Sequence, residues 1–363
     1  MRLLFDCRYV RVGRHDGISR YSASLVAELA RLMPVELLVS DERQLASLPA
    51  VPWHLVSSPT SPREPWIARE INRLEPDVVF SPMQTMGSQG RRYRLILTVH
   101  DLIYYRHRTP PSDLPWYVRL AWRLYHLAWW PQRRLLNGAD AVVTVSETTR
   151  VLISAHRLTK RPVFVVGNAP GELPPSVRAG AYQPDRSPRA VVHMGQFLPY
   201  KNIDTLVRAA EHLDGYEIHF MSAASDAEKA RLRALVTPDA AMRLVFHDGA
   251  SDAEYYGWLA RATALVTTSW DEGFGIPVVE AMRVGTPVVA SDIPIFREVG
   301  GDAAVFVDPA SASDVARGIR SLEDVYEWHS RSDASIRHAA RYSWAASASA
   351  LKAAIDTVAG PTP

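Results

Sequence analysis

The 363-residue sequence is poor in cysteine and in lysine, and it has no long hydrophobic run. Its single cysteine, Cys7, excludes an internal disulfide framework and is typical of a reducing compartment. No stretch of about 18 apolar residues occurs, and the N-terminal residues RLLFD lack the pattern of a signal peptide. From these absences we expect a cytoplasmic protein that does not cross a membrane.

An excess of charge of either sign is also lacking. Lys and Arg total 41 against 39 Asp and Glu, which gives a formal net charge of +2. This balance, together with the absence of a recognised binding module, argues against a nucleic-acid partner. The 47% of hydrophobic residues is typical of a folded globular protein, and the length favours two domains over one core.

Short β-branched runs alternate with longer amphipathic stretches, which predicts an α/β fold of parallel sheets covered by helices on both faces. In the first half we expect strands at residues 2–6, 35–39, 77–80, 94–99, 140–145 and 163–167. In the second half we expect them at 190–194, 217–221, 243–247, 264–267, 287–290 and 304–307. Residues 168–188 carry five prolines and no apolar periodicity, so they are the predicted linker.

Two doubly wound domains that face a cleft follow from this order of elements. Ligands of such sheets bind at the carboxyl ends of the strands. The stretch EGFGIPVVEAM, residues 272–282, comes directly after one predicted strand. Gly273 and Gly275 allow backbone N–H groups to approach a ligand, and Pro277 suits the first turn of a helix. The partial positive charge of a helix start makes this loop a predicted phosphate site.

Two glutamates, Glu272 and Glu280, flank this loop with seven residues between them. Side chains in the first turns of a helix lean back toward its N-terminus, so both carboxylates can reach one ligand. A carboxylate is a poor partner for phosphate but a good acceptor for sugar hydroxyls, so the pattern indicates a nucleotide-sugar. The alternative is simple strand-to-helix punctuation, with Glu280 on a solvated face.

The longer stretch EGFGIPVVEAMRVGTPVVASD, residues 272–292, resembles the signature of family-4 retaining glycosyltransferases of the GT-B fold. The resemblance implies two Rossmann-like domains facing a central cleft. It implies that Glu272 and the backbone of Phe274, Gly275 and Ile276 meet the donor sugar and diphosphate. It also implies that Glu280 binds the ribose hydroxyls.

A second phosphate element is predicted in HMGQFLPYKN, residues 193–202, after the first strand of the second half. Lys201 supplies a point charge for a diphosphate, and Gly195 permits close approach. In the family this loop carries an arginine directly after the glycine, whereas this chain has Gln196. Either another arginine substitutes, or Lys201 and the loop amides hold the diphosphate.

His100 and Asp101 follow the strand predicted at 94–99. A histidine at a strand end is often a packing or capping residue, but the resemblance places His100 against the donor sugar, with a hydrogen bond near the reacting carbon. Ser146, after the strand at 140–145, is also consistent with the family. Together with Asp101 it is expected on the acceptor side.

The resemblance covers nearly the whole chain. The loop with Gly13 and Gly17 is similar to the family's glycine loop, which borders acceptor and diphosphate, and the backbone from His247 to Gly249 would receive the base. The implied domains are residues 1–170 for the acceptor and 171–342 for the nucleotide-sugar donor. A last helix at about 343–360 would cross back onto the first domain.

The expected function is retaining transfer of a hexose to a glycolipid or saccharide hydroxyl in glycan or cell-envelope synthesis, with mannose from GDP-mannose as the first choice. His100, Glu272 and Lys201 are the predicted catalytic residues. No cofactor or metal is expected, because the chain has no Asp-x-Asp pair to hold a divalent ion to the diphosphate. The alternatives are another GT-B enzyme, an epimerase or inverting transferase, and a catalytically silent nucleotide-sugar-binding subunit.

A separate prediction concerns residues 115–134, PWYVRLAWRLYHLAWWPQRR. Trp116 to Trp130 is predicted as one helix, with Arg119, Arg123 and His126 in a narrow stripe on an otherwise apolar surface. Four tryptophans beside arginines are typical of an interfacial segment. Residues 91–160 hold twelve Arg and Lys against four Asp and Glu, so we expect peripheral contact with an anionic membrane. The alternative is that the tryptophans pack within a helix layer.

Overall fold

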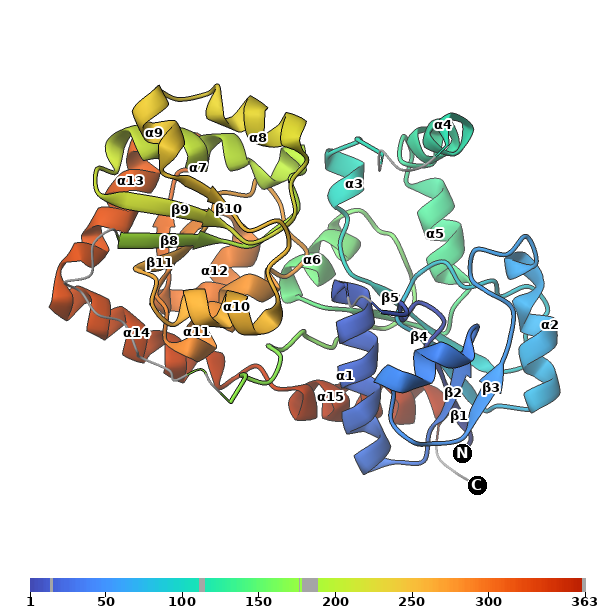
Figure 1. The fold of residues 1–363 in the computed structure, drawn as a ribbon. Coiled ribbons are helices and arrows are strands. Elements are labelled where there is room, and N and C mark those ends of the chain that lie inside the picture. Colours follow the sequence, from blue (N-terminus) through green and yellow to red (C-terminus); the bar gives the residue numbers. More distant parts are fainter. Residues whose placement is uncertain (14–15, 111–114, 176, 178–188, 361–363) are drawn as a thin grey trace. The chain divides into compact units, whose positions relative to one another are not determined.

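The computed structural model describes residues 1–13, 16–110, 115–175, 177 and 189–360 (Figure 1). The chain divides into two compact units, Met1–Asn168 with Ser343–Pro363, and Ala169–Tyr342. The predicted linker at 168–188 lies largely outside the described residues. Among the described helices, none combines the length and the apolar character that a bilayer crossing requires.

The first unit is built on a parallel sheet of seven strands in the order β3-β2-β1-β4-β5-β6-β7. The strands are β1 Leu3–Asp6, β2 Glu36–Val39, β3 Trp53–Leu55, β4 Val78–Ser81, β5 Arg94–Val99, β6 Ala141–Thr144 and β7 Val163–Val165. All six strands predicted for this half are confirmed. The prediction missed β3, an edge strand of three residues, because its exposed Trp53 and Leu55 do not follow a buried pattern.

Helices surround this sheet. They are α1 Gly17–Leu32, α2 Ile67–Ile71, α3 Ile103–Arg106, α4 Trp116–Tyr125, α5 Trp130–Asn137, α6 Glu147–Ala155 and α15 Trp344–Ala359, with 3-10 turns η1 Glu42–Ser47, η2 Glu64–Trp66 and η3 Asn72–Leu74. Asp16 caps α1, since its carboxylate accepts the N–H of Ser19 at 2.8 Å. The C-terminal α15 packs on α1 (Figure 1). The rings of Tyr21 and Trp344 are in edge contact between these helices.

The single helix predicted from Trp116 to Trp130 is wrong. The structure has two helices, α4 and α5, separated by residues 126–129. The physical reason is Pro131, which lies in the first turn of α5. Proline has no N–H and its ring clashes with the carbonyl four residues earlier, so a helix cannot run unbroken through this position, whereas a new helix can start there.

The second unit is built on a parallel sheet of six strands in the order β10-β9-β8-β11-β12-β13. The strands are β8 Arg189–His193, β9 Tyr216–Phe220, β10 Leu244–Phe246, β11 Ala264–Thr267, β12 Val288–Ser291 and β13 Val305–Val307. The six predicted strands of this half are therefore confirmed, and Val191, Ile218 and Val266 from three of them lie in one buried core.

Helices cover this second sheet as well. They are α7 Ile203–Ala209, α8 Asp226–Arg233, α9 Pro238–Met242, α10 Asp252–Leu259, α11 Ile276–Val284, α12 Pro294–Gly300, α13 Ala312–Arg320 and α14 Val325–Ala339, with 3-10 turns η4 Pro199–Lys201, η5 Ala210–His212, η6 Gly301–Ala303 and η7 Ser321–Glu323. The two parallel sheets with their helices are two Rossmann-like domains, as the sequence predicts.

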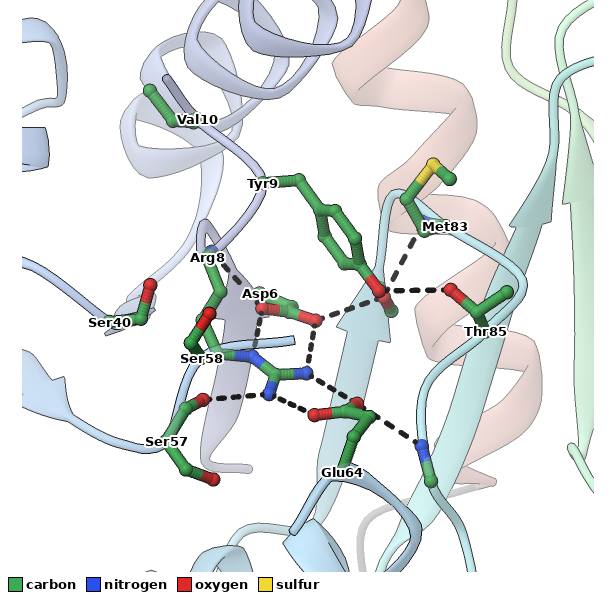
Figure 2. A network of polar contacts seen from close by, with 12 residues as sticks. Asp6, Arg8, Tyr9, Val10, Ser40, Ser57, Ser58, Glu64, Met83 and Thr85 are labelled. Carbon is green, nitrogen blue, oxygen red and sulfur yellow. Dashed lines mark hydrogen bonds and ion pairs between the residues drawn. The ribbon is translucent and has the colours of Figure 1, made fainter. Parts of the chain in front are cut away.

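A buried ion-pair network lies at the carboxyl end of β1 in the first unit (Figure 2). The Arg8 side chain is fully buried, and its Nε donates to Asp6 Oδ1 at 2.8 Å. Its Nη1 donates to Glu64 Oε2 at 2.7 Å and to the Ser57 carbonyl at 3.0 Å. One arginine thus joins the end of β1 to η2 and to the segment after β3.

The backbone around Arg8 is also held by hydrogen bonds. Gln44 Nε2 in η1 donates to the carbonyl oxygens of Arg8 at 3.1 Å and of Val10 at 2.6 Å. The Gly87 N–H donates to Glu64 Oε1 at 3.3 Å. These contacts anchor the chain just before the loop that contains Gly13.

Replacing Arg8 by Met should lower the free energy of unfolding of the first unit by about 3–5 kcal/mol, because it leaves the Asp6 and Glu64 carboxylates buried without their cation. Adding Asp6→Asn and Glu64→Gln should recover part of this loss. As a control, Arg31→Ala removes an exposed pair with Glu28 and should cost less than about 1 kcal/mol. Calorimetry and urea unfolding measure all three; equal losses for Arg8→Met and Arg31→Ala would contradict the role given to the network.

Candidate functional site

The candidate site lies at the carboxyl ends of β8 and β11 in the second unit. These two strands are neighbours, with Val191 opposite Ala264. From β8 the sheet continues through β9 to β10 on one side, and from β11 through β12 to β13 on the other. The connections after β8 and β11 therefore diverge, which makes this edge a topological switch point, where parallel α/β sheets bind their ligands.

Two of the predicted site residues meet here. Lys201 Nζ is 2.5 Å from Glu272 Oε1, and Ser269 Oγ donates to the same oxygen at 3.0 Å. The two charged side chains are only 16% and 12% exposed, so water screens their interaction less than at an open surface. The sequence predicts both residues as ligand-binding, but Ser269, which orients the carboxylate, was missed.

The loops that carry this pair are tied to each other. The N–H of Trp270 donates to the Tyr200 carbonyl at 2.8 Å. Asn202 Nδ2 donates to the Thr268 carbonyl at 3.0 Å, and Thr268 Oγ1 donates back to the Asn202 carbonyl at 2.8 Å. The two loops therefore form one unit, and the position of Lys201 relative to Glu272 is determined by more than their own ion pair.

Asn202 also links this loop to the helix that follows, α7. It has φ of 50°, in the left-handed region, between η4 and α7. Asparagine tolerates this conformation better than most residues other than glycine. This role was not predicted from the sequence, although an asparagine next to the lysine was the available signal.

The glycine loop after β11 has the geometry that the sequence predicts for close ligand approach. Gly275 has φ of 88° and is the N-cap residue of α11, and Pro277 lies in the first turn. Phe274 is buried, with its ring in edge contact with that of Tyr342. The phenyl group anchors the loop to the core, and the half-buried backbone of Gly273, Gly275 and Ile276 stays near the surface.

Glu280 is 3% exposed, one turn into α11. This burial contradicts the alternative in which it lies on a solvated helix face. A buried carboxylate is costly unless hydrogen-bond donors surround it, so its place in this helix calls for polar partners. The donor-binding role predicted for Glu280 stays a prediction.

Gly195 and Gln196 form the start of the loop after β8. The Gly195 N–H donates to Ser222 Oγ at 3.2 Å, and the Gln196 side chain is exposed. His247, after β10, has both ring nitrogens engaged: Nδ1 lies 2.8 Å from Glu254 Oε1, and Nε2 lies 3.0 Å from His219 Nδ1. Its backbone therefore offers more to a ligand than its ring.

His219 and Gly249 belong to the same surroundings. The His219 ring lies against the indole of Trp258 at 3.8 Å between centroids, and burial lowers the pKa of His219 to about 4. Gly249 has φ of 100°, in the region that favours glycine, and it lies in the turn after β10. Among the described residues, no group of three or more His, Cys, Asp or Glu side chains forms a set that could hold a metal ion.

The remaining predicted residues lie in the first unit. His100, after β5, donates from Nε2 to the Pro82 carbonyl at 2.8 Å, its ring is in edge contact with Tyr21, and burial lowers the pKa of His100. Asp101 accepts the Ile103 N–H at 3.0 Å. Ser146 caps α6 by accepting the Thr149 N–H at 3.1 Å.

The glycine loop of the first unit has one glycine with a backbone that other residues rarely adopt. Gly13 has φ of 77°, and Gly17 is the first residue of α1. A Cβ at either position would meet no described atom within 4 Å, but the positive φ makes any substitution of Gly13 strained. The acceptor-side role of this loop stays a prediction.

Two protein-family models together match almost the whole chain. Residues 15–169 match the model of Glycosyltransferase Family 4, and residues 180–340 match that of Glycosyl transferases group 1. The boundary between the two matches falls near the boundary between the two compact units.

Curated relatives match part of the chain. The O-antigen chain mannosyltransferase RfbU of Salmonella typhimurium is 28% identical over 192 residues, which cover 52% of this chain and 53% of that protein. The D-inositol 3-phosphate glycosyltransferase of Mycolicibacterium smegmatis is 30% identical over 241 residues, which cover 61% of this chain and 54% of that protein. The chain thus spans about half the length of the curated relatives it matches.

Solved structures match the chain over nearly its full length. The sucrose-phosphate synthase of Thermosynechococcus elongatus superposes with a TM-score of 0.75 at 17% identity, and the superposition covers 99% of this chain and 99% of that chain. Anabaena HepE, in complex with UDP and glucose, has a TM-score of 0.73 at 17% identity and covers 98% of this chain and 100% of that chain. At this level of identity the likeness shows the fold, which is GT-B.

Substituting Gly275 by Ala should lower the free energy of unfolding by about 1–3 kcal/mol and weaken nucleotide binding, since φ is positive there and a Cβ would lie 2.8 Å from Phe296 Cε1. Gly257→Ala in α10 is the matched control, because its Cβ would meet nothing within 4 Å and alanine favours a helix. Thermal unfolding and nucleotide titration of both variants test this; a harmless Gly275→Ala would mean that the loop does not need its glycine.

Proposed function

Because the chain belongs to family 4 of the GT-B glycosyltransferases, we propose that it transfers a hexose from a nucleotide-sugar to a hydroxyl of a glycolipid or saccharide, with retention at the anomeric carbon. The observation that carries the proposal is the Lys201–Glu272 pair at the switch point of the second sheet, beside a helix that begins at a glycine with positive φ. A cation, a helix start and a carboxylate are what a diphosphate joined to a sugar requires.

In the proposed reaction, the bond between the anomeric carbon and the diphosphate oxygen breaks, and the acceptor hydroxyl oxygen bonds to the same face of that carbon. The acceptor proton goes to the departing diphosphate oxygen. Lys201 and the backbone N–H groups of Gly273 to Ile276 stabilise the negative charge that develops on this oxygen. Glu272 holds the sugar hydroxyls. His100, whose Nε2 proton is donated to the Pro82 carbonyl, accepts a hydrogen bond at Nδ1 near the reacting carbon.

The remaining binding residues follow the same proposal. Glu280 binds the ribose hydroxyls, Gly195 and Gln196 border the diphosphate, and the backbone from His247 to Gly249 meets the base. The loop of Gly13 and Gly17, with Asp101 and Ser146, contributes to the acceptor side. The charge of Lys201 and the helix start replace a metal, so turnover should persist after exhaustive chelation.

GDP-mannose is the donor that we propose first. The matched relatives include a mannosyltransferase of Salmonella typhimurium, which supports mannose, whereas Anabaena HepE was solved with UDP and glucose, which supports a parallel test of both bases. Titrating GDP, UDP and ADP decides between the bases, and a tenfold preference corresponds to about 1.4 kcal/mol. Incubation with the preferred nucleotide-sugar and analysis of the product anomer then test transfer and retention. Binding without turnover on any acceptor would instead indicate a silent binding subunit.

Lys201→Ala and Glu280→Gln should each weaken nucleoside diphosphate binding by about 1.5–3 kcal/mol, since each removes a charge-assisted hydrogen bond. The controls are Lys352→Ala, whose pair with Asp356 is exposed on α15, and Glu327→Gln, whose partner is Arg331 on α14. Calorimetric titration measures all four variants. Affinity that is unchanged in both site variants would remove the proposed donor site.

Peripheral contact of the first unit with an anionic membrane belongs to the same proposal. No residue of α4 is buried, and several large apolar side chains at or beside it are more than half exposed. These are Trp116, Tyr117, Leu120, Leu124, Leu127 and Trp130. Arg123, Arg133 and Arg134 are exposed in the same segment, which suits an interface with anionic headgroups.

The alternative, in which the tryptophans pack in a helix layer, holds for two of the four. Trp122 is in edge contact with Tyr104, and Trp129 stacks on Tyr105 at 3.8 Å between centroids. Trp116 and Trp130 are 76% and 64% exposed. The packed pair holds the segment, and the exposed pair is free to enter an interface.

The chain should sediment with anionic vesicles at low salt and stay in solution with neutral ones, because a few basic residues near an anionic surface contribute about 1 kcal/mol each. Arg119→Glu with Arg123→Glu should release it, and so should Trp116→Ser with Trp130→Ser. Arg31→Ala with Arg43→Ala, exposed arginines elsewhere in the unit, serves as the control. If the unmodified chain stays in the supernatant with anionic vesicles, a soluble saccharide acceptor replaces the lipid-linked one.

A further inference from the structure

His193, the last residue of β8, lies directly beneath the loop of the proposed donor site. It is 1% exposed, and its Nδ1 lies 2.9 Å from the Val266 carbonyl oxygen of β11. Because a carbonyl oxygen only accepts hydrogen bonds, Nδ1 carries the proton, and Nε2 of the neutral ring is a bare acceptor. Among the described residues, nothing partners this buried Nε2.

The unpaired nitrogen faces the residues of the donor loop. A Cβ at position 195 would lie 3.3 Å from His193 Nε2 and 3.9 Å from Lys201 Cδ. Gly195 is itself partly exposed, so a single glycine separates the imidazole from the surface of the loop. Buried polar atoms without a partner are rare and costly, and one located beneath an anion site indicates a partner in the ligand-bound state.

The balance of charges at the proposed donor site also indicates a second cation. Glu272 already neutralises Lys201 at 2.5 Å, whereas the diphosphate of a nucleotide-sugar brings two negative charges. Lys201 and Glu272 are the charged groups that act on His193. From β9 and β11, its contacts are the uncharged Phe220 and Val266. In the free protein, burial lowers the pKa of His193 to about 4, so the ring is neutral at pH 7.

We propose, on the basis of the proposed function, that His193 is a further diphosphate-binding residue, which takes up a proton from solvent at Nε2 when the donor binds. The imidazolium then donates from Nδ1 to the Val266 carbonyl and from Nε2 to a diphosphate oxygen. Gly195 is required because any side chain at that position would separate the two groups.

This linkage has a definite sign. The negative charge of the donor raises the pKa of His193 in the complex above the free value of about 4. Below the free pKa the ring is already charged, and the affinity does not change with pH. Between the free and the bound pKa, binding takes up a proton, so the affinity falls as pH rises, by up to tenfold per pH unit. Above the bound pKa the affinity is again constant.

The experiment is calorimetric titration of the full chain with GDP-mannose and with UDP-glucose from pH 5 to pH 8, in buffers of different ionisation enthalpy. A nucleotide-sugar is suitable because its diphosphate is esterified at both ends and does not titrate in this range. The unmodified chain should take up a fraction of a proton that rises toward one per donor bound as pH falls through this range. Its affinity for the donor should fall severalfold for each unit by which pH rises.

His193→Asn is the informative variant, since the asparagine amide can still donate to the Val266 carbonyl but has no equivalent of Nε2. It should bind the donor about tenfold more weakly at pH 5 and lose both the proton uptake and the pH dependence. His338→Asn is the control: this histidine belongs to the same unit, burial lowers its pKa too, and its Nε2 lies 2.9 Å from the Val299 carbonyl. It should leave proton uptake unchanged.

The outcomes separate this inference from the proposed function. If the unmodified chain binds neither nucleotide-sugar, both fail. If it binds without proton uptake, or if His193→Asn keeps the pH dependence, the role of His193 is wrong and the proposed function stands. Should His193→Asn not fold, the imidazole nitrogen shifts of the unmodified chain decide: Nε2 must become protonated when donor is added, and an unprotonated Nε2 at saturation overturns the inference.

Discussion

The candidate site depends on the parallel pairing of β8 with β11. This pairing brings two chain segments about 70 residues apart to the same sheet edge, where Lys201 meets Glu272 at 2.5 Å. Hydrogen bonds between the loops, through Asn202 and Thr268, reinforce that meeting. Without the strand pairing, the lysine and the glutamate would be unrelated surface charges, for which an ion pair contributes little.

The two units use buried charge in different ways. In the first unit, Arg8 is fully enclosed and its donors are taken by Asp6, Glu64 and a carbonyl, so the network is closed and serves to hold the chain before the glycine loop. In the second unit, the Lys201–Glu272 pair is partly exposed and has the unpaired Nε2 of His193 beneath it. A closed network stabilises a fold, whereas an incomplete one leaves an interaction for a ligand to make.

The segment around α4 shows how one composition serves two purposes. Its four tryptophans read alike in the sequence, yet Trp122 and Trp129 pack on tyrosines while Trp116 and Trp130 are mostly exposed. Trp116 and Trp122 lie in the same helix, α4, six positions apart, and therefore on different faces of it. The break before Pro131, which turns one expected helix into two, separates Trp129 and Trp130 from that helix. The proline was visible in the sequence, and its effect on the preceding turn was the missed signal.

The sequence by itself determined the class of fold and the location of the donor loops. Runs of β-branched residues such as those of β5 and β6 are continuous because both faces of a parallel sheet are buried, so they can be recognised without neighbours. The glycine, proline and glutamate spacing of residues 272–280 is equally local. Edge strand β3, the support that Ser269 and Asn202 give to the ion pair, and the orphan nitrogen of His193 depended on the tertiary structure. Each of these arises from contacts between segments far apart in the chain, and local periodicity carries no information about which distant segments become neighbours.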